Sequence, residues 1–175
     1  MTQTQSGAIQ IRSFQAADRD GVMALAPRLT EWVSAWREPE AVLAAVRGWV
    51  SGAAGKAGDE DHAFYVAVAG DQIVGLVHVC EQAHFSGQVD AYVGELVVAP
   101  SWEGRGVGSR LMEAAESWAV GRGLVFITLD TGANNGPARG LYTSLGFTLE
   151  SVRLTKPVGY PSRKPLGNSS GGQSW

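Results

Sequence analysis

The chain of 175 residues has little of several features that would place it in a class at once. It has a single cysteine, Cys80, so no disulfide can form within it. No stretch has the pattern of a signal peptide or a transmembrane helix, and a cytoplasmic protein is therefore expected. Positive charge is not in excess, because 14 Lys and Arg stand against 17 Asp and Glu, for a formal net charge of −3. This balance argues against nucleic acid as a general partner, and no membrane partner is expected either.

The composition is that of one ordinary globular domain. Hydrophobic residues make up 45% of the chain and charged residues 18%, and the length is sufficient for a proper core. No internal repeat is visible. From residue 157 onward the chain is rich in Gly, Pro, Ser and basic residues and has few apolar ones. We therefore expect a single domain over residues 1–156 and a flexible C-terminal tail over residues 157–175.

The most informative stretch covers residues 94–112. Residues 95–99 form a short apolar run with β-branched side chains, which predicts a buried strand that ends at Pro100. Alternate glycines follow at Gly104, Gly106 and Gly108. Apolar residues then recur at helical spacing over 107–118. A glycine-rich turn between a strand and a helix lets backbone N–H groups converge on an anion at the positive end of the helix.

Two common phosphate-binding patterns do not fit this turn. A nucleoside triphosphate P-loop needs Lys and then Ser or Thr after its last glycine, but Ser109 and Arg110 follow Gly108. The dinucleotide pattern G-x-G-x-x-G, counted from Gly104, needs a glycine where Ser109 stands. That pattern also usually follows the first strand, whereas this turn lies past the middle of the chain.

The stretch resembles the acyl-CoA site of the GNAT superfamily of N-acyltransferases. The pattern of that family is Arg/Gln-x-x-Gly-x-Gly/Ala after a strand of the form Leu-x-Val-x-Pro, and residues 96–100 and 103–108 match it apart from the first position. A second signature, Asn-x-x-Ala-x-x-Leu-Tyr-x-x-x-Gly-Phe, is matched at residues 135–147. The departure is Glu103, which stands where the family has Arg or Gln. Arg105 and Arg110 can offset its negative charge.

The resemblance implies the GNAT-like fold, an α/β (α+β) architecture with helices on both faces of a central mixed sheet. The sheet is expected to be mostly antiparallel, with one parallel pair formed by strands 4 and 5, because the intervening helix makes a right-handed crossover. The pattern predicts strands at 8–14, 63–69, 72–80, 89–99, 124–129 and 147–154. It predicts helices from Asp18 with a break at Pro27, at 42–50 before a loop at 51–58, at 106–120 and at 135–145.

The resemblance also implies acetyl-CoA as the cosubstrate and no metal. The acyl group and pantetheine would lie along the central strand, and the pyrophosphate would lie on the glycine-rich turn. The implied cofactor-binding residues are Leu96, Val97, Val98, Glu103, Gly104, Arg105, Gly106, Val107, Gly108, Ser109, Asn135 and Tyr142. Tyr142 is also the expected general acid, because the family usually places a tyrosine near the thioester sulfur.

The group that removes a proton from the attacking amine is left open. Glu95 lies on the central strand and Asp130 ends the neighbouring parallel strand, so both carboxylates are expected to approach one cleft. Tyr92 is a third alternative. The remaining candidates are interpreted as structural residues rather than catalytic ones, and they are His62, His78, His84 and Cys80.

The acceptor is expected to meet the first two helices and the 81–91 connection. Trp32, Trp36 and Trp49 are interpreted as core residues, because they recur at helical spacing. Acidic residues gather in the same part of the chain, and those that face the cleft would attract a cation. The predicted function is N-acetyl transfer from acetyl-CoA directly to a primary amine of a small cationic acceptor, with a homodimer left open. The alternatives are a protein N-terminal or lysine acetyltransferase and a non-catalytic acyl-CoA-binding sensor.

Overall fold

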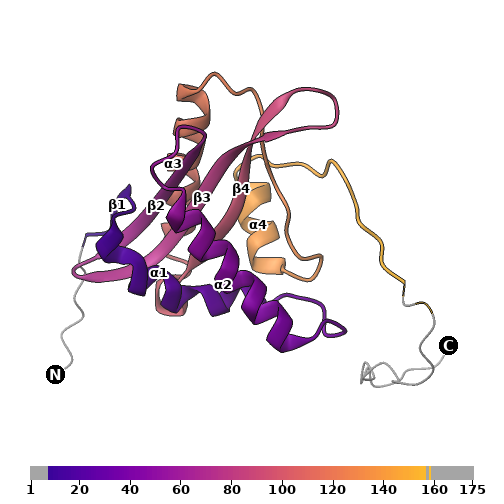
Figure 1. Ribbon diagram of the computed structural model, residues 1–175, viewed down its shortest axis with the longest axis horizontal. Helices are drawn as coiled ribbons and strands as arrows, with labels where there is room; N and C mark the ends of the chain where they lie inside the picture. Colours follow the sequence, from indigo (N-terminus) through magenta and orange to yellow (C-terminus); the bar gives the residue numbers. More distant parts are fainter. Residues whose placement is uncertain (1–7, 157, 159–175) are drawn as a thin grey trace.

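The computed structural model describes residues 8–156 and residue 158. At its centre is a five-stranded sheet in the order β1-β2-β3-β4-β5 (Figure 1). The strands are β1 (Gln10–Ser13), β2 (His62–Ala69), β3 (Gln72–Ala83), β4 (Val89–Val98) and β5 (Ile127–Leu129). Neighbouring strands from β1 to β4 are antiparallel, and β4 and β5 are parallel. The predicted mixed sheet with one parallel pair is confirmed.

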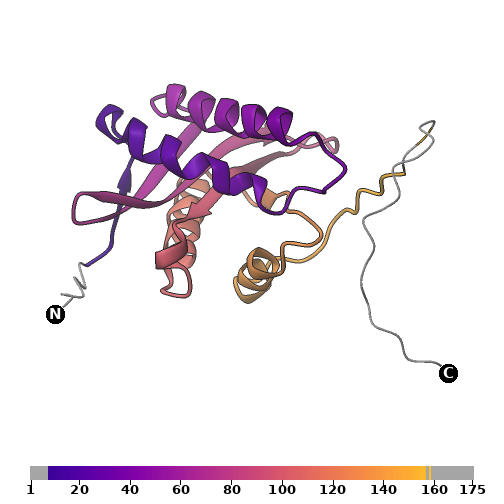
Figure 2. The same ribbon diagram turned by 90° about the horizontal axis from the view of Figure 1, so that it is seen from below.

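Helices cover both faces of this sheet (Figure 2). On one face lie α1 (Arg19–Leu25), the 3-10 helix η2 (Ala26–Thr30) and α2 (Pro39–Gly55). On the other lie α3 (Val107–Gly121) and α4 (Gly136–Ser144), and two short 3-10 turns, η1 (Ala16–Asp18) and η3 (Pro100–Trp102), complete the helical elements. The predicted break at Pro27 is confirmed, because the α-helix ends at Leu25 and the chain tightens into η2, where the missing N–H of proline costs little.

Each face of the sheet has its own core. Val22, Val50 and Leu76 are fully buried between α1, α2 and the sheet. Leu111 and Met112 of α3 are fully buried against the opposite face. Because side chains alternate along a strand, the two cores divide the odd and even positions of β2 between them. In β3 the alternation changes phase near Gly75, where the β2–β3 register shifts, so that Val74, Val77 and Val79 share one core. Within the described part of the chain, no helix is both long and apolar enough to cross a membrane.

Three sequence predictions are wrong. The loop expected at 51–58 is mostly helix, because α2 continues to Gly55 and buries Ala53 in the core, so packing outweighs the low helix propensity of glycine. The strand expected at 124–129 forms only over β5, and Val125 and Phe126 before it are 79% and 52% exposed. The strand expected at 147–154 is not formed, since β5 offers an edge of only three residues to pair with. The predicted tail at 157–175 lies outside the described residues apart from Val158.

Candidate functional site

The central strand β4 separates from β5 halfway along its length. The last pair of the parallel ladder is Val93 with Leu129, whereas β3 remains paired with β4 as far as Val98. In the described part of the chain, the backbone groups of 94–98 that point away from β3 therefore have no strand partner. Leu96, Val97 and Val98 lie in this segment, where an amide-bearing ligand can complete the ladder.

The glycine-rich turn joins this segment to α3. Gly104 and Gly106 have φ values of 68° and 76°, a left-handed conformation that a side chain with Cβ rarely adopts. Gly106 is the N-cap of α3, and no side chain caps this end of the helix. The first N–H groups of α3, from Val107 to Ser109, are therefore free to bind an anion at the positive end of the helix.

Gly108 has a different reason to be glycine. A Cβ atom at this position would lie 3.0 Å from the Leu141 side chain of α4. The glycine therefore lets the start of α3 pack closely against α4, which carries Tyr142. The sequence motif predicted a role in the turn for all three glycines, but this third one has a packing role that only the fold shows.

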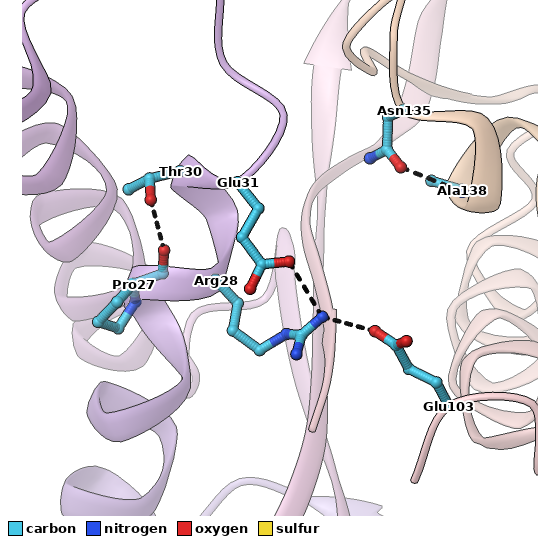
Figure 3. A network of polar contacts seen from close by, with 7 residues as sticks. All are labelled: Pro27, Arg28, Thr30, Glu31, Glu103, Asn135 and Ala138. Carbon is cyan, nitrogen blue, oxygen red and sulfur yellow. Dashed lines mark hydrogen bonds and ion pairs between the residues drawn. The ribbon is translucent and has the colours of Figure 1, made fainter. Parts of the chain in front are cut away.

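Glu103 is neutralised by a residue that the sequence analysis missed (Figure 3). Nη2 of Arg28, in η2, lies 2.5 Å from Oε1 of Glu103 and 3.2 Å from Oε2 of Glu31. The two arginines expected in this role lie elsewhere. Arg105 stacks over the Trp102 ring at 5.0 Å, and Arg110 donates to the Ile9 carbonyl at 2.9 Å. No local pattern could have revealed Arg28, because it is 75 residues away from Glu103 in the chain.

The second motif forms α4 as predicted. Oδ1 of Asn135 accepts a hydrogen bond from the Ala138 N–H at 3.2 Å, so Asn135 is the N-cap (Figure 3). Tyr142 packs against the α3 core, with its ring 5.7 Å from that of Phe147. Burial raises the pKa of Tyr142 to about 12. The hydroxyl therefore carries its proton at any physiological pH and is able to donate it or a hydrogen bond.

Glu95 is a buried carboxylate on the α1 and α2 face. The β3–β4 register places Glu95 opposite His78 but Val93 opposite Val79, so Gly94 is the extra residue of a β-bulge. This bulge brings Glu95 and Tyr92 to the same face of the sheet. Oε2 of Glu95 lies 2.9 Å from Nδ1 of His78, and both residues are only 8% exposed. Sequence reasoning treated His78 as a structural histidine satisfied by a partner, but it did not identify Glu95 as that partner.

Asp130 and Tyr92 form a second, more exposed pair. The Tyr92 hydroxyl donates to Oδ2 of Asp130 at 3.2 Å. Burial, followed by the negative charge of Asp130, raises the pKa of Tyr92 to about 12. Tyr92 is therefore a poor base near neutrality. Glu95 also contributes to this pKa, so the two predicted carboxylates lie near the same phenol, one buried and one in solvent.

The tryptophans of the acceptor side are not core residues. Trp32, Trp36 and Trp49 are 43%, 68% and 56% exposed, so their interpretation as core is wrong. The loop that carries Trp32 meets the loop after β5, because a Cβ atom on Gly132 would lie 2.9 Å from the Trp32 carbonyl oxygen. Segments about 100 residues apart therefore lie side by side, with aromatic surface exposed on one of them.

Comparison with known proteins gives consistent results. A family model described as Acetyltransferase (GNAT) family matches residues 22–147. A streptothricin acetyltransferase from Escherichia coli is 33% identical over 112 residues, which are 64% of this chain and 60% of that protein. An aminoglycoside N(6')-acetyltransferase type 1 from Klebsiella aerogenes is 39% identical over 64 residues, which are 37% of this chain and 41% of that protein. The matches thus span about half of each relative.

Solved structures share the fold. The crystal structure of a PaiA N-acetyltransferase from Thermoplasma acidophilum in complex with coenzyme A has a TM-score of 0.71 and 20% identity. The alignment covers 83% of this chain and 93% of that chain. An aminoglycoside N-acetyltransferase AAC(6')-Iy in complex with CoA has a TM-score of 0.64 and 18% identity, with 90% and 100% coverage.

Proposed function

Because the chain belongs to the acetyltransferase (GNAT) family, we propose that it is an acyl-CoA-dependent N-acetyltransferase that moves the acetyl group of acetyl-CoA directly onto a primary amine of a small cationic acceptor. One observation carries this proposal. The unpaired part of β4 ends at the positive end of α3, with a buried carboxylate, Glu95, on the same strand.

The donor site is built mainly from backbone. The free N–H groups at the start of α3 suit the pyrophosphate, and the unpaired edge of 94–98 suits the amides of pantetheine. A strand N–H in this segment can also donate to the thioester oxygen as negative charge develops there. One such donor typically contributes about 3 kcal/mol to the stability of the transition state.

The side chains supply the proton transfers. An alkylamine has a pKa of about 10.4, so most of it is protonated near neutrality and cannot attack until a base removes one proton. Glu95 is the proposed base, directly or through a water molecule. The amine nitrogen then attacks the thioester carbon and the C–S bond breaks. The Tyr142 hydroxyl gives the departing thiolate a hydrogen bond or proton, and the second proton lost by the nitrogen balances the one gained by the thiolate, so the products are the amide and the CoA thiol. Asp130 is a proposed second carboxylate of this site, where its exposed charge would attract the cationic acceptor.

The acceptor class is proposed from the chemistry around the free edge of β4. Glu95, Asp130 and Glu31 supply negative charge on this side, and Trp32 and Trp36 expose aromatic surface suited to cations. The relatives named for streptothricin and for an aminoglycoside N(6') position favour a small amine over a protein substrate. A cytoplasmic location and assembly as a homodimer remain sequence predictions.

The test is release of CoA thiol from acetyl-CoA in the presence of a panel of amines. Polyamines, aminoglycosides and streptothricin-like compounds form one arm, and peptides with free N-termini or lysines form the other. Saturable thiol release with a small amine, together with a mass increase of one acetyl group on that amine, supports the proposal. Turnover confined to peptides would refute the acceptor class. Tight acetyl-CoA binding without any turnover would indicate the non-catalytic sensor.

A further inference from the structure

A line of three titratable side chains runs across neighbouring strands on the α1 and α2 face. Oε2 of Glu95 on β4 lies 2.9 Å from Nδ1 of His78 on β3. Nε2 of His78 in turn lies 2.9 Å from Nδ1 of His62 at the start of β2. The side chain of His62 is 11% exposed, and Asp61 approaches its Nε2 at 3.8 Å. The line therefore connects the proposed base to the edge of the molecule.

The local sequence leaves space for this line. Because Gly94 has no side chain, His78 can approach β4 closely, since a Cβ atom there would lie 3.1 Å from Nδ1 of His78. The ring of Phe64 packs edge-on against His78, with centroids 6.1 Å apart. His78 is therefore held by Glu95, His62 and Phe64, and it is nearly excluded from solvent.

The geometry of the two histidines is that of a hydrogen bond. The two rings are within 12° of parallel, and their centroids are 5.2 Å apart. Because Nδ1 of His62 and Nε2 of His78 are only 2.9 Å apart, this separation means that the two nitrogens face each other along the line that joins the centroids. Cys80 lies near enough to complete a set of three metal-ligating atoms within 4.8 Å of one another. A tetrahedral zinc with Zn–N distances of about 2.0 Å would, however, hold the two nitrogens more than about 3 Å apart and at an angle.

We propose that His78 and His62 are positioning residues that fix the orientation of Glu95. An ionised Glu95 can only accept, so Nδ1 of His78 carries a hydrogen and Nε2 of His78 is left as an acceptor. His62 must then donate from its own Nδ1. Only this pair of tautomers satisfies both hydrogen bonds, and it leaves Oε1 of Glu95 for the acceptor's proton. The inference rests on the proposed role of Glu95 as the base.

The same line gives the site a response to acid. Nε2 of His62 can take a proton from water, which turns this imidazole into an imidazolium, because an imidazole is more basic than a carboxylate. The charged His62 still donates from Nδ1, so its hydrogen bond to His78 is kept and the added proton stays at the edge of the molecule.

The groups around His62 set the pH at which it takes up this proton. Burial, and then the neighbouring His78, lower the pKa of His62 below its ordinary value, and Lys56 acts in the same direction. Asp61 and Asp59 oppose the shift. Cys80, from β3, is the other titratable group beside it. His62 is therefore expected to take up its proton on the acid side of the ordinary histidine pKa of about 6.5.

A matched pair of variants separates positioning from packing. In His62→Asn the amide nitrogen takes nearly the place of Nδ1 and can donate to His78, whereas His62→Leu has the same shape and no donor. The Leu variant should lose about tenfold or more in kcat at pH 8 with little change in the KM for acetyl-CoA, and Asn should restore most of the loss. An unchanged kcat in the Leu variant, or an equal loss in Asn and Leu, would overturn the proposal.

A measurement that needs no turnover can test this inference independently of the proposed function. Nitrogen-15 NMR of the imidazoles should show His78 with its hydrogen on Nδ1 at pH 8, and Glu95→Gln should disturb that tautomer. The Nε2–H tautomer in the wild-type protein would contradict the inference even if acetyl transfer is confirmed. Metal analysis of the purified protein completes the test, because one equivalent of zinc would show that the cluster is a metal site instead.

Discussion

Substitution of Tyr142 by phenylalanine tests how much the Tyr142 hydroxyl stabilises the leaving thiolate. Burial raises the pKa of Tyr142 to about 12, whereas a thiol has a pKa of about 8.5. Complete proton transfer from the phenol to the thiolate is therefore uphill by more than three pKa units, or about 4 to 5 kcal/mol. A charge-assisted hydrogen bond is instead the expected contribution of Tyr142, and such a bond is worth about 1.5–3 kcal/mol.

This energy fixes the expected kinetic effect. Tyr142→Phe should lower kcat about 10- to 100-fold, because each 1.4 kcal/mol corresponds to about a factor of ten. Phenylalanine keeps the ring that packs near Phe147, so the melting temperature and the KM for acetyl-CoA should change little. The measurements are steady-state thiol release and thermal unfolding of both proteins.

The pH dependence supplies the decisive control. A phenol with a pKa of about 12 does not ionise below pH 10, so Tyr142 should produce no basic limb in the wild-type profile between pH 7 and pH 10. A basic limb in that range which disappears in Tyr142→Phe would refute the reasoning from burial. A wild-type turnover rate in the variant would show that Tyr142 only packs and that water supplies the proton.

Three further predictions follow from the site and the fold. Gly106→Asp should abolish acetyl-CoA binding, while Gly106→Asn should retain much of it. Both side chains tolerate the left-handed conformation, but only Asp repels phosphate. Equal affinities of the two variants by calorimetry would refute pyrophosphate binding at the start of α3. Glu103→Gln should lower the Kd for acetyl-CoA several-fold, and Arg28→Ala should raise it, with both effects becoming smaller in high salt. If both variants shift the Kd in the same direction, the ion pair is merely structural. Asp18 accepts two hydrogen bonds from Arg12, at 2.6 and 2.8 Å, which lower its pKa, so Asp18→Asn should reduce the free energy of unfolding at pH 7 by about 2 kcal/mol. Because the folded-state pKa is depressed, that difference should be full above about pH 4 and vanish as the pH falls through the lowered pKa, as followed by urea unfolding.

The parts of the site that were predictable from sequence are those in which neighbouring residues act through their backbone. The strand, the left-handed glycines and the start of α3 are contiguous in the chain, so their spacing is visible in the sequence itself. The N-cap of α4 is local in the same way, since Asn135 and the Ala138 N–H are three residues apart. Local geometry determines these features, and the rest of the fold only has to leave them intact.

The contacts that were missed join residues far apart in the chain. Arg28 reaches Glu103 only because η2 lies beside the glycine-rich turn. His78 meets Glu95 only because the bulge at Gly94 shifts the register of β4, and a shift of one residue exchanges the faces of a strand. Trp32 and Trp36 are exposed because the predicted helical face is interrupted there by an irregular segment between η2 and α2. Trp49 lies within α2 but on its exposed face.

The proposed contacts to the donor and to the acceptor come from different kinds of structure. The proposed donor contacts are backbone atoms of one continuous segment, so most side chains on the surface could change without altering them. The proposed acceptor contacts come from β4, the loop before α2 and the loop after β5. His62 on β2 and His78 on β3 position Glu95, Tyr92 contacts Asp130, and Gly132 approaches Trp32, so these elements are joined to one another. A substitution in any one of these elements moves side chains contributed by the others. Acceptor preference is therefore expected to change through residues that touch Glu95 or Asp130 indirectly, while the affinity for acetyl-CoA stays nearly constant.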